Sequence, residues 1–483
     1  MRLSRDKMLQ AMLSSDSDFD GRFVTGVLTT GIYCLPSCRG RKPKPENVRF
    51  FPDAARARDA GLRACLRCRP DDFVAGVGRQ ESLIEGVVAR LFESPGSYRK
   101  ASDLARAAGV SLSTLHQLVR RYFQTTPARL MRRARIRGSS AQLLRSERSI
   151  TEIAFENGFE SLSAFNLHFR EQMRLRPSAF RELRDSASFT ISLPSSFDRQ
   201  SVLAYLGRDP MSRTDRVIGQ AFETAVFLDG RPARLRIELD DASAVCTFTG
   251  SDPSAAAFAE AHAIALRRLG LGVGPDGFEH LIRHLPDTDR MVYRPGLRVP
   301  LTSTPFDAML WAVVGQQVNL SFAFTLMRAL VDLCGTDAGH GLRTMPRPIE
   351  LAGLSVTELQ ARQFSRAKAS YLTGLARAVM EKTVCGAHDT SRLDAIPATR
   401  VERELTAVRG IGVWSARYIM MRGYGFEDCV PVGDVALERS LMRTFSLEQR
   451  PDHQQTESLM ARFSPFRTLA TFYLWQSLSE PAA

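Results

Sequence analysis

Residues 405–439 read LTAVRGIGVWSARYIMMRGYGFEDCVPVGDVALER, and this stretch decides what the C-terminal part of the chain can be. A helical run ends before the Gly-Ile-Gly turn at 410–412, and a second helical pattern with Trp414 and Tyr418 on one face follows. A loop then brings Asp434 to the start of a third helix. Because glycine has no Cβ, the N–H groups of such a turn can face a phosphate oxygen at a helix N-terminus. The stretch predicts a hairpin that clamps nucleic-acid backbone beside a carboxylate, with a plain helix–helix turn as the alternative.

The longer motif is more specific than the turn alone. The pattern G-I-G-x-W-x-A that begins at Gly410, with Asp434 opening a helix downstream, resembles the helix-hairpin-helix DNA glycosylases. Within them it is most similar to the 3-methyladenine DNA glycosylase II (AlkA) type. The resemblance extends over residues 190–478 and includes PFDAMLWAVVGQQV at 305–318 and FSPFRTLATFYLW at 463–475.

The resemblance implies a catalytic carboxylate and an aromatic pocket. Asp434 would stabilise oxocarbenium-like charge on the sugar and orient water, whereas a simple helix N-cap is the structural alternative. Trp414, Tyr418 and Trp475 would hold an alkylated purine, whose positive charge is attracted to each ring face by roughly 0.5–2 kcal/mol. Core packing is the alternative for each ring. It is favoured for Phe306, disfavoured for Tyr418 and Trp475, and left open for Trp414.

Contacts to DNA are expected from the hairpin and from one glutamine. Gly410 and Gly412 would bind the phosphate backbone. Gln317 aligns with the residue that fills the gap left by a flipped base, although the family's apolar wedge is absent there and a buried capping glutamine is the alternative. The chain departs from the family at Arg409, where a proline usually precedes the hairpin, and at 432–433, which replace a more acidic approach to the carboxylate.

The reaction type follows from two absences. Bifunctional members of the superfamily place a Schiff-base lysine where Trp414 stands, and the iron–sulfur branch needs cysteines after Cys429, where this chain has none. The resemblance therefore implies a monofunctional glycosylase, which removes the base and leaves the backbone intact.

The length and the charge of the chain indicate several domains and a nucleic-acid partner for the front part. A chain of 483 residues with 44% hydrophobic content is expected to form several folded domains. Residues 1–187 hold 33 Lys and Arg against 20 Asp and Glu, whereas residues 188–483 hold 32 of each sign, so the net charge of +13 lies in the front part and favours nucleic-acid binding there. The sequence shows no apolar run of membrane-spanning length and no secretory signal, so we expect a cytoplasmic, nucleoid-associated protein without a membrane partner.

Four of the eight cysteines are clustered near the N-terminus. Cys34-x3-Cys38 and Cys65-x2-Cys68 offer two thiolate pairs, the donor set of a tetrahedral zinc site. In a cytoplasmic chain this clustering favours metal over disulfides. The sequence therefore predicts one Zn²⁺ bound by four cysteines. A zinc ion that only stabilises the fold is the alternative to one that takes part in chemistry.

The sequence around the first two of these cysteines, TTGIYCLPSCR at 29–39, resembles the N-terminal domain of the Ada methylation-response protein. The resemblance implies that Cys34 accepts a methyl group from a DNA methylphosphotriester. A metal-bound thiolate stays ionised and nucleophilic at neutral pH. The basic residues expected to hold the strand are Arg39, Arg41, Lys42 and Lys44. The remaining cysteines lack the Pro-Cys-His-Arg context of the second Ada acceptor module, so repair of O6-methylguanine is not predicted.

Two helix-turn-helix patterns occupy residues 79–187, ASDLARAAGVSLSTLHQLVRRYF and SITEIAFENGFESLSAFNLHFREQM, joined by a basic linker helix. Tandem units ending in RLRPSAFRE resemble the AraC-type DNA-binding domain, which implies that the second helix of each unit enters a major groove. Candidate base contacts, with solvated surface as the alternative, are Ser113, Thr114, His116, Gln117, Ser163, Asn166 and His168. Candidate phosphate contacts are Arg120, Arg121, Arg132 and Arg133.

These patterns predict a multidomain protein, mainly α with α+β parts. Its expected domains are a zinc-binding methylphosphotriester acceptor domain of α+β type at 1–78, an AraC-type double helix-turn-helix domain at 79–187, an AlkA N-terminal-like α+β domain at 188–300, and an all-α helix-hairpin-helix glycosylase domain at 301–483. The third domain is expected to support the glycosylase and to carry no chemistry of its own.

The expected function is an alkylation-damage response that combines methyl capture, activation of repair genes and excision of alkylated purines such as 3-methyladenine. The expected partners are double-stranded DNA, both alkylated and operator, and RNA polymerase, and the chain is expected to be a monomer. The alternative is a transcription regulator whose glycosylase domain only binds DNA.

Overall fold

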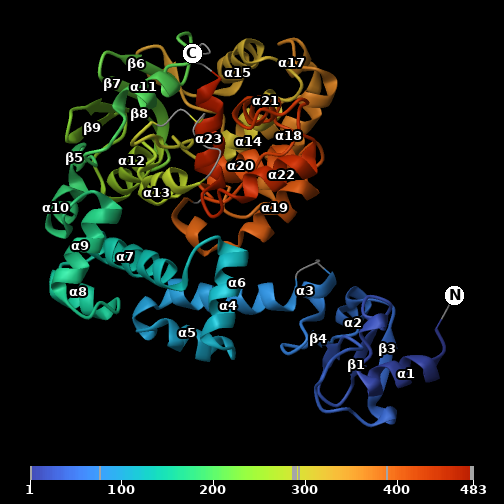
Figure 1. Cartoon of the computed structure of the whole chain (residues 1–483). Helices are drawn as coiled ribbons and strands as arrows, with labels where there is room; N and C mark the ends of the chain where they lie inside the picture. The colour runs from blue at the N-terminus through green and yellow to red at the C-terminus, as the bar shows by residue number, and fades with distance from the viewer. Residues whose placement is uncertain are drawn as a thin grey trace. The chain divides into compact units, whose positions relative to one another are not determined.

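A computed structural model of the chain describes residues 3–74, 78–272, 274–285, 291, 294–387 and 390–478 (Figure 1). The chain forms two compact units, residues 1–89 with 105–118 and residues 90–104 with 119–483. Among the described residues, no helix has both the length and the apolar character needed to span a membrane.

The N-terminal part is a small mixed sheet with short helices. Its strands are β1 (Val24–Val27), β2 (Ile32–Cys34), β3 (Val48–Phe51) and β4 (Arg63–Ala64), in the order β3-β1-β2-β4, with only the β2–β4 pair parallel. The helices are α1 (Arg5–Ser14), α2 (Ala54–Asp59) and α3 (Pro70–Val74), with 3₁₀ turns at Ser17–Phe19 and Pro45–Asn47. Its central apolar cluster consists of five buried residues: Val24, Tyr33, Phe51, Ala54 and Ala57. A core this small needs a further constraint to be stable.

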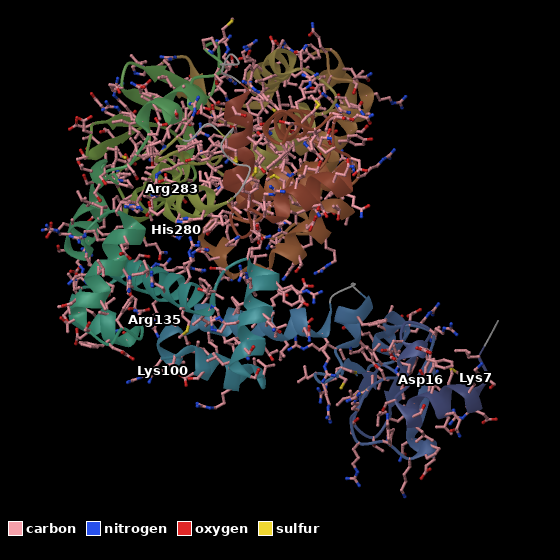
Figure 2. The ribbon with its side chains drawn as sticks, in the orientation of Figure 1. Lys7, Asp16, Lys100, Arg135, His280 and Arg283 are labelled. Atoms are coloured by element: carbon pink, nitrogen blue, oxygen red, sulfur yellow. The ribbon has the colours of Figure 1, made fainter. Side chains whose placement is uncertain are left out.

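The next segment is entirely helical. Its helices are α4 (Arg79–Glu93), α5 (Ala101–Ala108), α6 (Leu112–Phe123), α7 (Pro127–Arg145), α8 (Ile150–Glu156), α9 (Leu162–Met173) and α10 (Pro177–Glu182), with 3₁₀ turns at Pro95–Ser97 and Leu183–Asp185. The predicted helix pairs α5–α6 and α8–α9 are confirmed, each with a glycine at positive φ in its turn. Ser149 starts α8 with a capping box, and Arg135 on α7 (labelled in Figure 2) donates to the backbone oxygens of Tyr98 and Arg99, at 2.9 and 2.7 Å.

A five-stranded antiparallel sheet follows, in the order β5-β9-β8-β7-β6. Its strands are β5 (Ser188–Ser192), β6 (Asp215–Ile218), β7 (Ala221–Leu228), β8 (Arg231–Leu239) and β9 (Ser243–Thr249), and its helices are α11 (Arg199–Leu206), α12 (Ala255–Arg268) and α13 (Asp276–His284). Asp229 and Gly230 form the turn between β7 and β8, and both have positive φ, as a two-residue hairpin of this twist requires.

The remainder is helical apart from a short hairpin of β10 (Asp337–Gly339) and β11 (Leu342–Arg343). The helices are α14 (Pro305–Val314), α15 (Leu320–Cys334), α16 (Pro348–Ala352), α17 (Val356–Gln360), α18 (Arg366–Met380), a 3₁₀ turn at Thr390–Ala395, α19 (Ala398–Ala407), α20 (Val413–Ile419), a π-helical continuation at Met420–Tyr424, α21 (Val435–Thr444), α22 (His453–Ala461) and α23 (Arg467–Ser477). A short turn that contains Gln316 and Gln317 separates the two core helices α14 and α15.

Two apolar cores organise the second unit. One runs from Phe165 and Phe180 of the helical segment through the five-stranded sheet to Phe472 of α23. The other lies among α14, α15, α18, α19 and α20. Trp475 packs against both, so α23, drawn in red in Figure 1, lies where the sheet-side and helical cores meet. This junction is where the aromatic residues of the predicted base pocket are found.

Candidate active site and metal centre

Four cysteine side chains converge in the N-terminal part of the chain. Cys34 ends β2 and Cys65 directly follows β4, and the parallel pairing of these strands brings the two to the same end of the sheet. Cys38 and Cys68 lie in the turns that follow, and all four sulfur atoms are within 4.8 Å of one another. Metal–sulfur bonds of about 2.3 Å in a tetrahedral zinc site place sulfur atoms about 3.8 Å apart, so small side-chain movements complete the site.

The chemistry of this donor set fits a divalent cation. Hydrogen bonds with Cys38 and Cys68 raise the pKa of Cys34, and the bond from Cys34 lowers the pKa of Cys38 to about 2. Thiols this close compete for protons because adjacent thiolates repel one another, and a divalent cation removes that repulsion. The four cysteines form a zinc site, as predicted.

Basic side chains lie near this cluster in two different roles. Arg39 and Arg41 are exposed and available to a polyanion. Lys42 was expected to hold DNA with them, but its ammonium group donates to the Cys38 carbonyl at 2.8 Å and to the Ser15 hydroxyl at 2.7 Å. Lys42 therefore fixes the loop that carries the second thiolate.

The hairpin between α19 and α20 depends on one of its two glycines. Gly410 has φ +93°, and a Cβ there would lie 2.3 Å from the ring of Tyr371, so no other residue fits. Gly412 is exposed, caps the N-terminus of α20 and has open space where a Cβ would be. Gln316 braces the turn, because its amide donates to the Gly410 carbonyl at 2.8 Å and to the Ser415 hydroxyl at 3.0 Å.

Gln317 lies at the bend between α14 and α15, with its side chain exposed and its backbone at φ +56°. The alternative of a buried capping glutamine at this position is therefore wrong, and the neighbouring Gln316 does the bracing. Its exposure is compatible with insertion into a DNA gap, which stays a prediction.

Asp434 is held in one orientation by three N–H donors. It caps α21, where its Oδ1 accepts from the backbone N–H of Leu437 at 2.8 Å. The indole N–H of Trp475 donates to the same oxygen at 2.9 Å, and the indole N–H of Trp414 donates to Oδ2 at 3.1 Å. Asp434 is thus both the N-cap and the acidic group of an aromatic site, and the three donors suit an ionised carboxylate.

Three half-buried rings stand around this carboxylate. Trp414 and Tyr418 stack with centroids 5.7 Å apart at 21°, and Tyr418 lies 6.4 Å from Trp475 at 42°. The structure therefore brings together all the residues expected to line the base pocket. Phe306 is 2% exposed within the helical core, as predicted.

Sequence reasoning missed the contribution of the sheet domain. Tyr205 on α11 packs edge-on against Phe472 of α23 at 5.0 Å, and Arg208 just after α11 lines one cavity together with Tyr418. The sheet domain was expected to support the glycosylase and to carry no chemistry of its own, and the structure places its Arg208 on the wall of a cavity that Tyr418 also lines. The only local signal was an aromatic residue followed by an arginine at a helix end, which is too common to single out.

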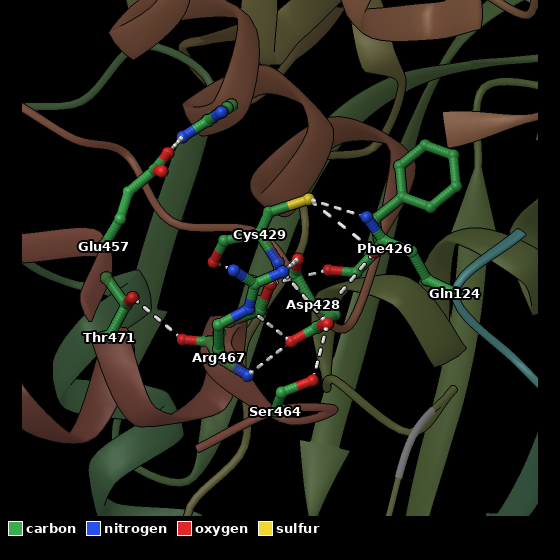
Figure 3. A network of polar contacts seen from close by, with 10 residues as sticks. Gln124, Phe426, Asp428, Cys429, Glu457, Ser464, Arg467 and Thr471 are labelled. Atoms are coloured by element: carbon green, nitrogen blue, oxygen red, sulfur yellow. Dashed lines mark hydrogen bonds and ion pairs between the residues drawn. The ribbon is translucent and has the colours of Figure 1, made fainter. Parts of the chain in front are cut away.

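The loop that leads to Asp434 is anchored from two directions (Figure 3). Arg467 of α23 donates to the carboxylate of Asp428 at 2.6 and 3.0 Å, and Gln124 accepts from the Asp428 backbone N–H at 3.1 Å. Glu427 beside it is paired with Arg129 and Arg133 of α7, at 2.8 and 3.0 Å. The segment that follows α6 therefore helps to hold the loop before the acid.

The polar residues predicted to contact bases have different surroundings. Exposed positions on α6 and α9 are Ser113, His116, Gln117, Ser163 and Asn166. Thr114 is half-buried and shares a hydrogen bond with Ser111, and His168 is half-buried and paired with Glu171. Arg120, Arg121 and Arg132 are exposed, whereas Arg133 is engaged by Glu427 and Asp394, so it cannot serve as a free phosphate contact.

Family models match three separate parts of the chain. Residues 7–71 match the metal binding domain of Ada, residues 104–183 a helix-turn-helix domain, and residues 310–465 the HhH-GPD superfamily of base excision DNA repair proteins. The chain is an Ada-type regulator fused to an AlkA-type glycosylase. In this Ada–AlkA fusion the four cysteines, the helices α6 to α9 and Asp434 each lie within the matched segment of the corresponding type.

Individual relatives agree with this architecture. A probable bifunctional transcriptional activator/DNA repair enzyme AlkA of Mycobacterium tuberculosis is 29% identical over 99% of this chain and 97% of its own length. The regulatory protein ada of Salmonella typhimurium is 34% identical over 37% of this chain and 49% of its own length. The structure of a 3-methyladenine DNA-glycosylase from Archaeoglobus fulgidus, 17% identical, covers 60% of this chain and 97% of that chain with a TM-score of 0.52, which shows the shared fold.

Proposed function

We propose that the fusion excises alkylated purines, 3-methyladenine among them, from duplex DNA and leaves the strand uncut. The observation that carries this proposal is Asp434 fixed by two indole N–H groups at the mouth of a three-ring site. The target nucleotide must leave the stack, at a cost of a few kcal/mol. The faces of Trp414 and Tyr418 would then hold the flipped base.

The side chains of the site would stabilise the charge of the transition state and would not need to act as a strong general acid. An alkylated purine is a good leaving group because it already carries positive charge. As the glycosidic bond lengthens, positive charge develops on the sugar, and the ionised Asp434 would stabilise it while orienting the attacking water. Trp414 offers no amine for a Schiff base, so the product is an abasic site in an intact strand.

The second proposed activity is transfer of a methyl group from a DNA methylphosphotriester to Cys34. The sulfur would form a bond to the methyl carbon as the carbon–oxygen bond breaks, and the phosphodiester would leave as an anion. When bound, zinc keeps the thiolate ionised at neutral pH. The thioether product does not revert, so each chain would act once.

The methylated zinc domain would then act with the double helix-turn-helix as a transcriptional activator of repair genes. Loss of one negative charge from the zinc site lowers its repulsion against DNA, which would strengthen operator binding. We place the protein in the cytoplasm at the nucleoid, acting as a monomer that contacts RNA polymerase.

One experiment tests both activities together. The full-length protein is incubated with alkylated duplex DNA, and freed bases and protein mass are measured on the same sample. We expect released 3-methyladenine and one added methyl group on Cys34. The variant Asp434→Asn should lose base release by at least about 100-fold while it still gains the methyl group.

A matched control distinguishes catalysis from helix capping. Asp452 caps α22 as Asp434 caps α21, accepting from the backbone N–H of Gln455 at 2.8 Å, so Asp452→Asn should retain activity. DNA binding without any base release by the wild type would favour a regulator whose glycosylase domain only grips DNA. An unmodified Cys34 would rule out the sensor.

A further inference from the structure

Arg208 occupies a fixed position at the edge of the aromatic site. Its Nε donates to the Tyr205 carbonyl at 2.9 Å, and its guanidinium carbon lies 3.6 Å from the centroid of the Tyr205 ring. The Arg422 guanidinium lies 4.5 Å from the same centroid and donates to the Tyr205 hydroxyl. Stacking and one backbone bond therefore orient Arg208, although it follows the end of α11 and belongs to the sheet domain.

The outer donors of Arg208 are available. Within the described part of the chain, its two terminal amino groups donate to no protein acceptor. Three other arginines of the same cavity wall are each paired with a carboxylate: Arg213 with Asp332 at 3.2 Å, Arg268 with Asp215 at 3.0 Å and Arg328 with Asp209 at 2.6 Å. Among the described residues, Arg422 of the same wall has no carboxylate partner either, but it is buried and donates to the Tyr205 hydroxyl. Arg208 is therefore the exposed arginine of this wall whose terminal amino groups are left for a ligand.

Arg208 faces the base site through Tyr418. Both residues line one cavity, and the charge of Arg208 lowers the pKa of Tyr418, although burial has the larger effect and raises it. Asp434 acts on Tyr418 with the opposite sign. Arg208 is exposed to solvent, yet desolvation by the surrounding protein lowers its pKa, as expected for a cation on a concave wall. The charges of the Arg208 cation and the Asp434 carboxylate therefore both act on Tyr418.

We propose that Arg208 is a specificity-determining residue that selects flipped bases with an acceptor oxygen at the edge turned toward it. This inference rests on the proposed glycosylase function and narrows its substrate class. A guanidinium has only donors. It can bind the O6 carbonyl of 7-methylguanine or hypoxanthine, whereas the exocyclic amino group of 3-methyladenine meets it donor to donor and leaves both unpaired.

The test compares two lesions in one tube. DNA treated with a methylating agent contains both 7-methylguanine and 3-methyladenine. Because both nucleosides carry a positive charge, the main difference between the two bases is the carbonyl of one and the amino group of the other. The full-length protein releases bases from this DNA, and chromatography gives the rate constant for each base. Because a charged hydrogen bond discriminates strongly, Arg208→Ala should lower release of 7-methylguanine relative to 3-methyladenine by about 10- to 100-fold.

Two further variants complete the test. Arg208→Lys keeps the charge but loses the planar fork, so it should fall between wild type and Arg208→Ala. Arg213→Ala removes a carboxylate-paired arginine from the same wall and should leave the ratio within about twofold of wild type. Melting curves of each variant report folding.

The outcomes separate the two levels of inference. An unchanged ratio in folded Arg208→Ala or Arg208→Lys, with both bases still released, overturns the role of Arg208 and leaves the glycosylase proposal intact. Release of neither base by the wild type overturns both. A lowered release of both bases in equal proportion also overturns the selective role, because it would show a general structural effect.

Discussion

At the scale of single residues, the geometry assigns unequal parts to neighbours that look alike in the sequence. Gly410 and Gly412 are two residues apart, yet only the first is closed in by another side chain. Gln316 and Gln317 are adjacent, yet the first braces the hairpin and the second is exposed. The motif sets which residue types occur, and the packing of α18 and α14 against the hairpin decides what each of them does.

The two glycines should therefore respond differently to alanine. Gly410→Ala places a Cβ against Tyr371 at φ +93° and should destabilise the glycosylase part by about 1–3 kcal/mol or more. Gly412→Ala meets open space and should keep the melting temperature within about 2 °C. Thermal unfolding measures both, and equal melting temperatures for the two variants would contradict the assigned strain.

A buried histidine makes stability depend on pH. Burial lowers the pKa of His262 to about 4, against the smaller opposite effect of its contact with the Met173 carbonyl at 2.7 Å. Between pH 6.5 and pH 4 the unfolded chain binds a proton that the folded chain does not. The stabilisation is therefore complete above pH 6.5 and is lost as pH falls toward 4, by up to about 3 kcal/mol.

Melting temperatures measured from pH 7 to pH 4 check this expectation. His262→Gln should flatten the acid dependence while lowering stability at pH 7, whereas His280→Gln, at an exposed position, should change neither. A profile for His262→Gln as steep as that of the wild type would show that other groups set the acid limit.

At the scale of elements, helix α7 is more than a linker between two DNA-reading helices. Its Arg129 and Arg133 bind Glu427, whose side chain is 11% exposed, in the loop that leads to Asp434. The sequence predicted that this basic helix contacts phosphates, but in the fold Arg129 and Arg133 face the carboxylate of Glu427 instead. Arg132 on the same helix is exposed, so it is available to DNA, whereas the adjacent Arg133 is held in an ion pair.

Substitution of the two adjacent arginines should separate stability from DNA affinity. Arg133→Ala leaves partly buried carboxylates without one of their cations and should lower the free energy of unfolding by about 1–3 kcal/mol. Arg132→Ala should leave stability unchanged and weaken operator binding at low salt. The slope of the binding constant against salt concentration should fall by the amount expected for one lost phosphate contact. Urea unfolding and binding titrations provide the measurements, and a reversed pattern would contradict this assignment.

At the scale of the whole molecule, the two compact units have very different means of stabilisation. In the N-terminal zinc domain the apolar cluster around Tyr33 is small, whereas the second unit contains two extensive apolar cores. The zinc site therefore contributes most to the part of the chain with the least hydrophobic stabilisation. The residues proposed for base excision, by contrast, all lie in the second unit.

Metal removal should affect one function and spare the other. Metal analysis should find one zinc per chain in the wild type and none in Cys38→Ser. The variant should lose protection of the N-terminal domain from proteolysis and lose methyl transfer, while it releases alkylated bases at a rate within about twofold of wild type. Loss of base release together with zinc would contradict the independence of the glycosylase.

Sequence alone determined the local structure and the classes of site. Helical periodicity, the Gly-x-Gly turn, the cysteine spacing and the helix-turn-helix patterns each depend on neighbours within a few turns, so they can be recognised before any fold is known. The helix predicted to start after Asp434 is confirmed for this reason, as α21 (Val435–Thr444).

Only the tertiary structure decided which distant groups complete each site. Arg208 lines the same cavity as Tyr418 although more than two hundred positions separate them in the chain, and Arg133 pairs with Glu427 across a still longer separation. Such pairings follow from how α11, α7 and α23 pack around the shared cores, and side-chain contacts between remote segments leave no periodic signal in the sequence. The sequence therefore indicated an acid among aromatic residues, and the packing of the sheet domain placed Arg208 on a cavity wall that Tyr418 also lines.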